Sequence, residues 1–593
     1  MILRKVHQTF THVLRYLQKR LNEKQFLILS SVLVGISCGL AAVVLKLFAH
    51  NINLFVARYS NNYQEFFLFT LFPLVGLSLT VLYIRYFVKK GEFMKGSADI
   101  VYSIAKKSST LPESQMYSHV ISSALTVGFG GSVGLESPLV STGSAIGANF
   151  GKTYHLSYKS RTLLLACGAA AAIAGAFNAP IAGVLFAIEV LLTDVSVAAF
   201  IPLIISAASG ALFSKIILGE GVLLSFNTVT PFNYNNTPYY ILLGILAGFT
   251  SLYYMRIFSI VEHRISLIRN DYTKVVMAGL VLALLLITFP PLFGEGYEGI
   301  KSLAALNHRS LMQNSILQPL LTSEWTILTF LLLLALVKVF ATAITLGSGG
   351  SGGNFAPSLC VGAYLGYAFS YFINLTGLAR IPQGNFTLVA MAGILSGVFY
   401  APLTAIFLIA EITGGYTLMI PLMLVAAISN VIMKYFEPLS MENKKLATKM
   451  NLSTESRDKY LLSKLDMEKM IETNFQAVKP DDTLRVLITA ISKSKRNMFP
   501  VVTNDQELAG VILLDNIKEM IFNHELYDKV VIKEIMTHPL AIIHPEENLN
   551  SVIKKFEETG QWNLPVIENG RYLGFLSKSS ILSEYRAELL RSS

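Results

Sequence analysis

Apolar runs long enough to cross a lipid bilayer dominate the chain from about residue 25 to about residue 436. A bilayer core takes roughly 20 apolar residues per helical span. Four runs meet or approach this length, at residues 26–48, 240–257, 275–289 and 327–345. Several further runs are shorter or are interrupted by glycine and proline. A soluble protein can bury one such run but not a long succession of them, so the sequence predicts a multi-pass membrane protein.

Polar residues gather at the two ends of the chain. Charged residues make up 15% of the whole, against about 25% in a typical soluble domain. The first 24 residues are basic and amphipathic, with an apolar face formed by Val6, Phe10, Val13, Leu14 and Leu17. We expect a helix lying on the cytoplasmic surface of the membrane there. An anionic inner leaflet then accounts for the net charge of +10 without a nucleic-acid partner.

Two glycine-rich interruptions of the apolar region repeat each other. Residues 128–138 can be laid on residues 347–357, 219 positions further on, with several glycine or serine positions and the closing proline in register. A second match pairs residues 175–180 with residues 397–402, 222 positions further on. The order and spacing of the matches indicate an internal duplication. Transporters built from duplicated halves usually bind their substrate where broken helices of both halves meet near the membrane midplane.

The interruptions have the composition of an anion site made by the backbone. Glycine lets the backbone approach a ligand closely, and a following proline suits the first turn of a helix. The first N–H groups of that helix have no partner within it, and they carry the positive end of the helix dipole. They can therefore hold an anion without a basic side chain. Two such helix starts, one from each half, can face the same point.

Three glutamates stand near these interruptions. Glu136 lies inside the first one, where the second half has Phe355. A carboxylate at membrane depth costs about 3 kcal/mol, but it is tolerable if it occupies the anion site itself. Glu136 would then compete with the permeant anion and act as a gate sensitive to pH and voltage; the alternative is an acid that only stabilises the helix dipole. Glu189 and Glu411, each nine residues after a repeated proline, fit a structural role and a pathway role equally well.

The polar tail contains a second repeat, with a period of 65 residues. Residues 480–484 correspond to residues 545–549, and residues 499–502 correspond to residues 564–567. Each copy has the pattern strand, helix, strand, turn, strand, helix. The sequence therefore predicts a soluble α+β pair after the membrane part.

Together, these motifs resemble the CLC family of chloride channels and proton–chloride antiporters, from about Leu27 to the C-terminus. Residues 134–138 (GLESP) are similar to the family's G-[RK]-E-G-P motif, and residues 353–357 (GNFAP) are similar to its G-x-F-x-P motif. The resemblance implies that Glu136 is the gating residue. It also implies an anion-binding site formed by Gly134, Gly353, Asn354 and Phe355, in which the backbone N–H groups of Asn354 and Phe355 are the ligands. The tail resembles a pair of cystathionine-β-synthase-type (CBS) modules.

The resemblance implies an all-α polytopic membrane domain with up to about 18 helices in two inverted halves, many of them short or broken, followed by a cytosolic α+β tandem CBS pair. It also implies a homodimer with one pore in each subunit. We expect a multi-pass protein of the cell membrane with both termini in the cytoplasm. The expected domains are an amphipathic helix (1–24), the transmembrane domain (25–440), a linker (441–465), and the two CBS modules (466–527 and 528–593).

The chain departs from the family pattern along the pathway. The family's G-S-G-I-P motif is only partly kept, and in it Ser97 would offer its hydroxyl to the anion. The inner proton-transfer glutamate of coupled exchangers would directly follow Glu189, where Val190 stands. The tyrosine of the inner gate is replaced by Ser440 or by Glu442, depending on the alignment.

The tail departs from its family as well. CBS pairs often bind adenine nucleotides, but the ribose-binding aspartates would fall at Asn516 and Ser580. These replacements do not favour a nucleotide, and we expect no cofactor; an adenine nucleotide at the CBS pair is kept as the alternative. The three cysteines lie far apart within apolar runs and have no metal-ligand or disulfide spacing, so no metal site is expected.

The sequence predicts passive or weakly proton-coupled permeation of chloride or another small anion, because the valine at position 190 has no group that can carry a proton. The alternative is a proton-coupled chloride antiporter in which water or Glu189 replaces the relay. A remote alternative, a CBS-regulated transporter of divalent cations, would need clustered oxygen ligands, which the apolar runs lack. The chain has no nucleophile–base spacing and no phosphate-binding loop of the Walker type, so we expect no enzyme.

Overall fold

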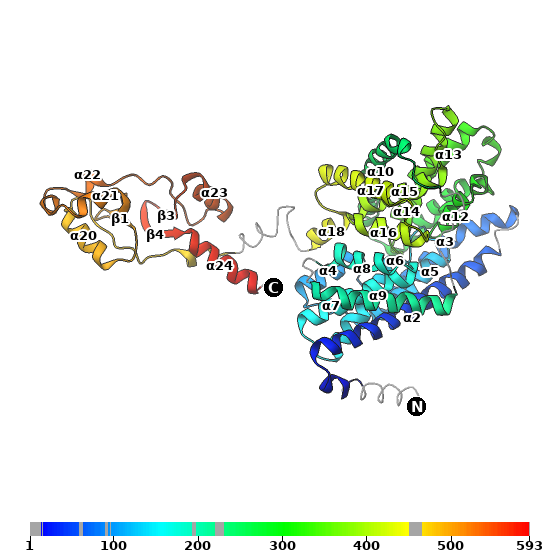
Figure 1. Cartoon of the computed structure of the whole chain (residues 1–593), viewed down its shortest axis with the longest axis horizontal. Helices are drawn as coiled ribbons and strands as arrows, with labels where there is room; N and C mark the ends of the chain where they lie inside the picture. The colour runs from blue at the N-terminus through cyan, green and yellow to red at the C-terminus, as the bar shows by residue number, and fades with distance from the viewer. Residues whose placement is uncertain are drawn as a thin grey trace. The chain divides into compact units, whose positions relative to one another are not determined.

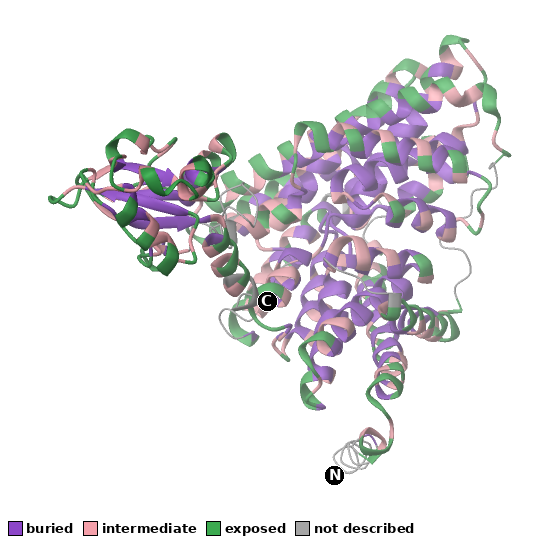
Figure 2. Ribbon diagram, turned by 60° about the vertical axis from the view of Figure 1, so that its left-hand side comes forward, coloured by how far each residue is buried: buried purple, intermediate pink, exposed green. Residues whose placement is uncertain are grey.

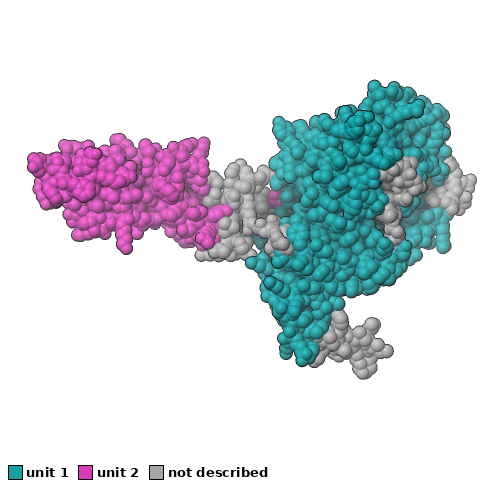
Figure 3. Space-filling view, viewed as in Figure 1, with its two compact units in different colours: residues 1–446 teal, residues 447–593 magenta. Residues whose placement is uncertain are grey.

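The structure is a computed structural model that describes residues 14, 16–58, 63–88, 93–94, 96–192, 197–219, 230–449 and 465–591. The chain divides into two compact units, residues 1–446 and residues 447–593 (Figure 3). Most of the expected amphipathic helix at residues 1–24, and most of the expected linker, lie outside the described residues. The first unit extends to Leu446, and α18 (Met441–Lys449), which begins where the linker is expected, buries Met441 in the core of that unit.

The secondary-structure elements of the first unit are helices throughout its described part, and the helices of each half pack mainly with one another (Figure 1). The helices of its first half are α2 (Glu23–Ala57), α3 (Tyr63–Phe87), α4 (Ser97–Lys106), α5 (Gln115–Gly128), α6 (Glu136–Thr153), α7 (Tyr158–Phe177), α8 (Pro180–Phe186), the π-helical turn η1 (Ala187–Leu191) and α9 (Val197–Leu218). The helices of its second half are α10 (Thr237–Ser266), α11 (Asp271–Thr288), α12 (Tyr297–Ala304), α13 (Glu324–Gly347), α14 (Phe355–Thr376), α15 (Gln383–Phe399), α16 (Pro402–Ile412) and α17 (Met419–Phe436). Within the described residues, nine segments are long and apolar enough to cross a membrane.

The duplication predicted from the sequence is visible in the backbone. Helices α6 and α14 begin 219 positions apart, and α8 and α16 begin 222 positions apart, at Pro180 and Pro402. The helix before each proline ends on a left-handed residue, Asn178 (φ 56°) or Tyr400 (φ 59°). Glycine or asparagine is the usual residue at such an end. A tyrosine held in the same conformation as its asparagine counterpart indicates that both halves require this turn.

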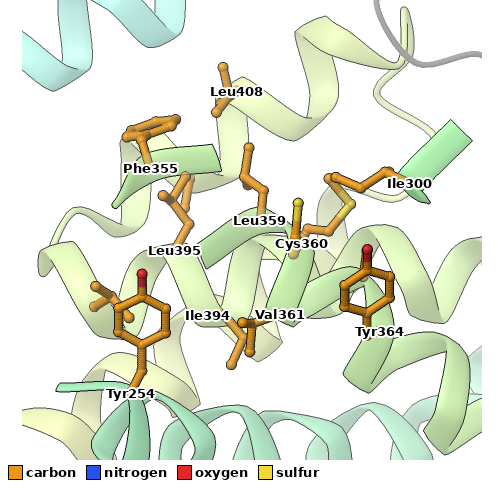
Figure 4. Close-up of a cluster of buried hydrophobic side chains, with 14 of the residues drawn as sticks. Tyr254, Ile300, Phe355, Leu359, Cys360, Val361, Tyr364, Ile394, Leu395 and Leu408 are labelled. Carbon is orange, nitrogen blue, oxygen red and sulfur yellow. The ribbon is translucent and has the colours of Figure 1, made fainter. Parts of the chain in front are cut away.

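The interior of the first unit is apolar and closely packed. Figure 2 shows buried residues lining the facing sides of its helices, and Figure 4 shows a cluster around α14 in which Leu359 and Tyr364 lie near side chains of α10, α12 and α15. Glycine allows some helices to touch through bare backbone: a Cβ at Gly143 would come within 2.3 Å of the Gly168 carbonyl oxygen, which joins α6 to α7. This packing fixes the directions in which the short helices point.

The second unit consists of two small α+β modules. The first contains α20 (Leu484–Lys493), β1 (Met498–Val502), β2 (Leu508–Leu513) and α21 (Leu514–Ile521), and the second contains α23 (Leu549–Thr559), β3 (Asn563–Glu568), β4 (Arg571–Ser577) and α24 (Lys578–Arg591). Each sheet is an antiparallel pair, β1 with β2 and β3 with β4. The short helix α22 (Ile532–Ile535) lies between α21 and α23 in sequence.

One feature expected of the tail is wrong. The sequence predicts a strand before the first helix of each module, but among the described residues that strand is reduced to a single parallel bridge, Val478 to Val501 and Ile543 to Val566. Proline stands two residues after each bridge, at Pro480 and at the corresponding place in the second copy. Because proline has no N–H group to donate, the ladder cannot continue there.

Candidate anion-binding site

The two glycine-rich segments meet in space at the starts of α6 and α14. The Gly134 N–H donates to the Gly353 carbonyl at 2.9 Å, and the Gly353 N–H donates to the Gly134 carbonyl at 2.8 Å. A Cβ at Gly353 would come within 2.5 Å of the Ser137 Cβ, so this approach requires glycine. Reciprocal contacts of this kind are what a two-fold axis between two equivalent halves produces.

This bridge occupies the N–H groups of two predicted site residues. The N–H groups of Gly134 and Gly353 are bonded to each other's carbonyl oxygens, so the two glycines join the halves of the unit. Their part in binding an anion stays a prediction. The backbone donors that lack a partner within a helix are those that follow, at the first residues of α6 and α14.

The Glu136 carboxylate lies at the point where these helix starts meet. Glu136 is the first residue of α6 and only 3% exposed. Its Oε1 accepts a hydrogen bond from the Tyr297 hydroxyl at 2.7 Å. The carboxyl group also lies near the backbone amides of Glu136 itself and of Ala356 in the first turn of α14, while its Oε2 is buried and makes no hydrogen bond with the described residues. The carboxylate thus occupies the position that the two helix starts would offer to an anion.

The start of α14 is held by neighbours on several helices. The Phe355 ring lies among three other aromatic rings. The centroid of its ring is 5.5 Å from that of Phe177, 6.3 Å from that of Phe186 and 5.4 Å from that of Phe399. The Asn354 Oδ1 accepts a hydrogen bond from the buried Tyr254 hydroxyl at 3.4 Å. These contacts fix the direction of the first N–H groups of α14.

A cavity of about 230 Å³ lies beside the meeting point, and its lining includes Ser97, Glu136, Gly353, Asn354 and Phe355. The structure therefore brings together predicted site residues from three distant parts of the sequence. Ser97 is buried and begins α4, so a third helix start contributes to the same cavity.

Ser440 and Glu442 are the two residues that could stand where the family has its inner-gate tyrosine, and their surroundings differ. Glu442 lines the cavity, and its Oε2 accepts the Ala98 N–H at 3.0 Å. Ser440 is buried outside the lining, and its Oγ accepts the Asn443 N–H at 3.2 Å. The geometry places Ser440 at the cap of α18 and leaves Glu442 as the residue that faces the cavity.

Glu189 and Val190 lie away from this cavity. The Glu189 carboxylate accepts the N–H groups of Leu403 and Thr404 at 3.1 and 2.8 Å, and the Thr404 hydroxyl at 2.7 Å. With three donors at the start of α16, the geometry favours the structural role considered for Glu189 over a role in proton transfer. Val190 is half-buried in η1 and packs against the main core.

Three polar residues around the Glu136 carboxylate were not predicted from the sequence: Tyr297, Glu295 and Lys338. The Glu295 Oε1 accepts the Leu135 N–H at 3.2 Å, just before α6. Lys338 is fully buried, and its Nζ donates to the Ser132 hydroxyl at 2.9 Å and to two backbone carbonyls. Two signals could have revealed them: a glutamate between two glycines just before a tyrosine, and a single lysine within a long apolar run.

The tail offers no carboxylate at the two positions where CBS modules hold a ribose. Asn516 stands at the first, and the preceding Asp515 pairs with Lys518 at 2.7 Å. At the second, the Ser580 hydroxyl donates to the Ser577 carbonyl at 2.9 Å. Across the described part of both units, no group of three or more histidine, cysteine, aspartate or glutamate residues could hold a metal ion.

Comparison with known proteins gives matches to both units. Residues 75–434 match the family described as "Voltage gated chloride channel", and residues 467–523 and 532–587 each match the CBS domain. A protein of Ralstonia nicotianae described as "Putative chloride channel protein ClcB-like" is 30% identical over 361 residues, which cover 60% of this chain and 80% of that protein. The "H(+)/Cl(-) exchange transporter ClcA" of Vibrio cholerae is 29% identical over 310 residues, which cover 50% of this chain and 62% of that protein.

Solved structures with the same fold extend these matches. A slow cyanobacterial Cl⁻/H⁺ antiporter aligns with a TM-score of 0.63 at 20% identity, covering 73% of this chain and 100% of that one. A eukaryotic CLC transporter aligns with a TM-score of 0.60 at 18% identity, covering 93% of this chain and 97% of that one. At these identities the likeness concerns the fold, and it confirms the predicted many-helix membrane unit.

Proposed function

Because the chain belongs to the voltage gated chloride channel family, we propose that it carries chloride or a similar small anion through a membrane pathway gated by Glu136. The observation that carries the proposal is the position of the Glu136 carboxylate between the starts of α6 and α14. A carboxylate seated against backbone amides takes the place of an anion that needs no basic side chain. Displacing or protonating it frees that place, so Glu136 acts as a gate.

The ligands of the permeant anion are, in this proposal, the N–H groups of Asn354 and Phe355 together with the Ser97 hydroxyl. All three residues line the cavity beside Glu136. The helix starts supply positive potential there, and the apolar surroundings strengthen it, because charges interact more strongly where water is scarce. An anion and the Glu136 carboxylate compete for overlapping positions and cannot occupy them together.

The pathway is, we infer, passive or weakly coupled to protons. Support comes from Val190, which replaces the inner glutamate of coupled exchangers, and from the engagement of Glu189 by three donors. The second candidate function is proton-coupled exchange. It is favoured by the similarity to proteins described as H(+)/Cl(-) exchange transporters.

The test uses the purified full-length protein in liposomes, with chloride efflux and proton movement recorded together. Wild-type protein is expected to release chloride with little or no uphill proton movement. Glu136→Gln is expected to carry chloride without dependence on pH, because its side chain is neutral at every pH. Chloride-driven uphill proton transport that disappears in Glu136→Gln would decide for the exchanger, and absence of anion flux in both proteins would overturn the proposal.

Family membership also supports a homodimer in the cell membrane, with one pathway in each subunit and both termini in the cytoplasm. The mass of the protein in detergent tests the assembly, and protease access to the tail in sealed vesicles tests the orientation. A monomeric mass that carries full anion flux would contradict the dimer, and cleavage of the tail from the outside of intact cells would contradict the orientation.

A further inference from the structure

A second carboxylate, that of Glu442, occupies a helix start in the same cavity as Glu136. Its Oε2 accepts the Ala98 N–H at 3.0 Å, although the two residues are 344 positions apart in sequence. Ala98 is the second residue of α4. Its N–H therefore belongs to the group that lacks a partner inside the helix and carries the positive end of the dipole. The Glu442 carboxylate thus holds a place that suits an anion.

The backbone before α4 lies against this carboxylate and close to the start of α6. Gly96 has a φ of 81°, and a Cβ there would come within 3.4 Å of the Glu442 Oε2 and 3.9 Å of the Ser137 Oγ. Ser137 directly follows Glu136 on α6. The starts of α4 and α6 therefore face each other across the cavity, and a carboxylate is seated at each of them.

The lysine of α18 that stands one helical turn from Glu442 is engaged elsewhere. Lys445 stands three residues after Glu442 on α18, a spacing at which two side chains can pair. Its Nζ instead bonds the Glu262 carboxylate of α10 at 2.9 Å and lies 5.2 Å from the centre of the Phe258 ring. The charge of Glu442 is therefore directed at the α4 start and not taken up by Lys445.

We propose that Glu442 is a second tethered anion, which closes the α18 end of the pathway as Glu136 closes its centre; this inference rests on the proposed function. A permeant anion then displaces two carboxylates in turn, one at the start of α4 and one between α6 and α14. Like charges repel at short range, so an anion that enters one place favours release of the carboxylate from the other. A tyrosine at the same position could not compete in this way, because it carries no negative charge at neutral pH.

The test measures chloride flux against chloride concentration for wild type and Glu442→Gln in liposomes. Glutamine keeps an acceptor for the Ala98 N–H and nearly the same volume, but it carries no charge. The half-saturating chloride concentration is expected to fall about tenfold, which corresponds to about 1.4 kcal/mol of lost competition, while the thermal unfolding temperature stays unchanged. The matched control is Glu298→Gln, an exposed glutamate of α12 paired with Lys301 at 3.0 Å, which is expected to change neither quantity.

An unchanged half-saturating concentration in Glu442→Gln overturns the inference, because Glu442 then only caps α4. So does a rise in that concentration together with a lower unfolding temperature. Glu442→Ala gives a second check, since it removes the cap and the charge together; it must lower the half-saturating concentration even where its stability falls. Absence of anion flux in wild type and in Glu298→Gln would mean that the proposed function itself is wrong, and the inference falls with it.

Discussion

Glu189 and Glu411 cap each other's helices. The Glu189 carboxylate, in the turn that continues α8, accepts the N–H groups of Leu403 and Thr404 at the start of α16, at 3.1 and 2.8 Å. The Glu411 carboxylate, near the end of α16, accepts two N–H groups at the start of α8, also at 3.1 and 2.8 Å. This exchange explains why a glutamate stands nine residues after each repeated proline. Each acid satisfies the donors of the other half and interacts favourably with its dipole.

Removing either acid is expected to destabilise the membrane unit. Glu189→Ala and Glu411→Ala each leave two backbone donors without a partner, which costs about 1–3 kcal/mol. The loss should be larger for Glu189, because the Thr404 hydroxyl also donates to it at 2.7 Å. Thermal unfolding in detergent measures both losses. Glu189→Gln should leave the chloride-to-proton flux ratio of wild type unchanged, and a changed ratio would contradict the structural role.

The ends of the broken helices were predictable because their signals are local. Glycine-rich segments followed by proline mark helix starts, and α8 and α16 begin at the repeated prolines that the sequence singles out. The same reasoning located Glu136 beside the second interruption, because a duplicated pair of segments is expected to meet. What glycine does at the meeting point was not predictable: Gly134 and Gly353 use their N–H groups on each other.

Contacts between distant segments escaped the sequence because nothing local encodes them. Tyr297 bonds Glu136 across 161 positions, and Lys338 bonds Ser132 across 206 positions. Neither Tyr297 nor Lys338 belongs to a repeated motif, so only the packed structure shows that they lie beside the first glycine-rich segment. The sequence left Ser440 and Glu442 open for the same reason. The two residues lie two positions apart, and only the fold determines which one faces the cavity.

Tyr297→Phe is expected to make the gate easier to displace. The phenol donates to the Glu136 carboxylate at 2.7 Å, and a hydrogen bond to a charged group contributes about 1.5–3 kcal/mol. Its loss should raise chloride flux at low chloride about tenfold or more, since each 1.4 kcal/mol corresponds to about tenfold. Initial rates of chloride efflux from liposomes measure the effect.

The matched control for this variant is Tyr364→Phe. Tyr364 is a fully buried tyrosine of the same unit, on α14, whose hydroxyl makes no hydrogen bond with other described residues. Its loss should leave the flux unchanged. If both variants raise the flux equally, loosened packing is the cause and Tyr297 does not hold the gate.

Lys338→Met is expected to lower both stability and anion flux. The ammonium group ties the first glycine-rich segment, through Ser132, to the loop before α12, through the Leu292 and Gly294 carbonyls. Each acceptor left alone costs about 1–3 kcal/mol, but removing a buried charge also removes its desolvation cost, so we expect a net loss of about 1–3 kcal/mol. Thermal unfolding and chloride efflux measure the two effects. Lys301→Met, at an exposed pair on α12, is the control and should change neither.

The stability of the second unit is expected to fall at acidic pH through one exposed ion pair. The Arg485 guanidinium donates two hydrogen bonds to the Asp528 carboxylate, at 2.7 and 2.6 Å, and holds the pKa of that carboxyl below its usual value. The folded form therefore binds the proton less tightly than the unfolded form. The stabilising contribution is fully present above the unfolded-state pKa of about 3.9 and is lost as the pH falls through the folded-state pKa.

Hydrogen exchange of β1 and β2 in the full-length protein, corrected for the intrinsic effect of pH, should report this loss of stability. It should be smaller in high salt, because both side chains are exposed. Asp528→Asn should show no such loss in that pH range, and a loss equal to that of wild type would mean that other carboxyl groups cause it.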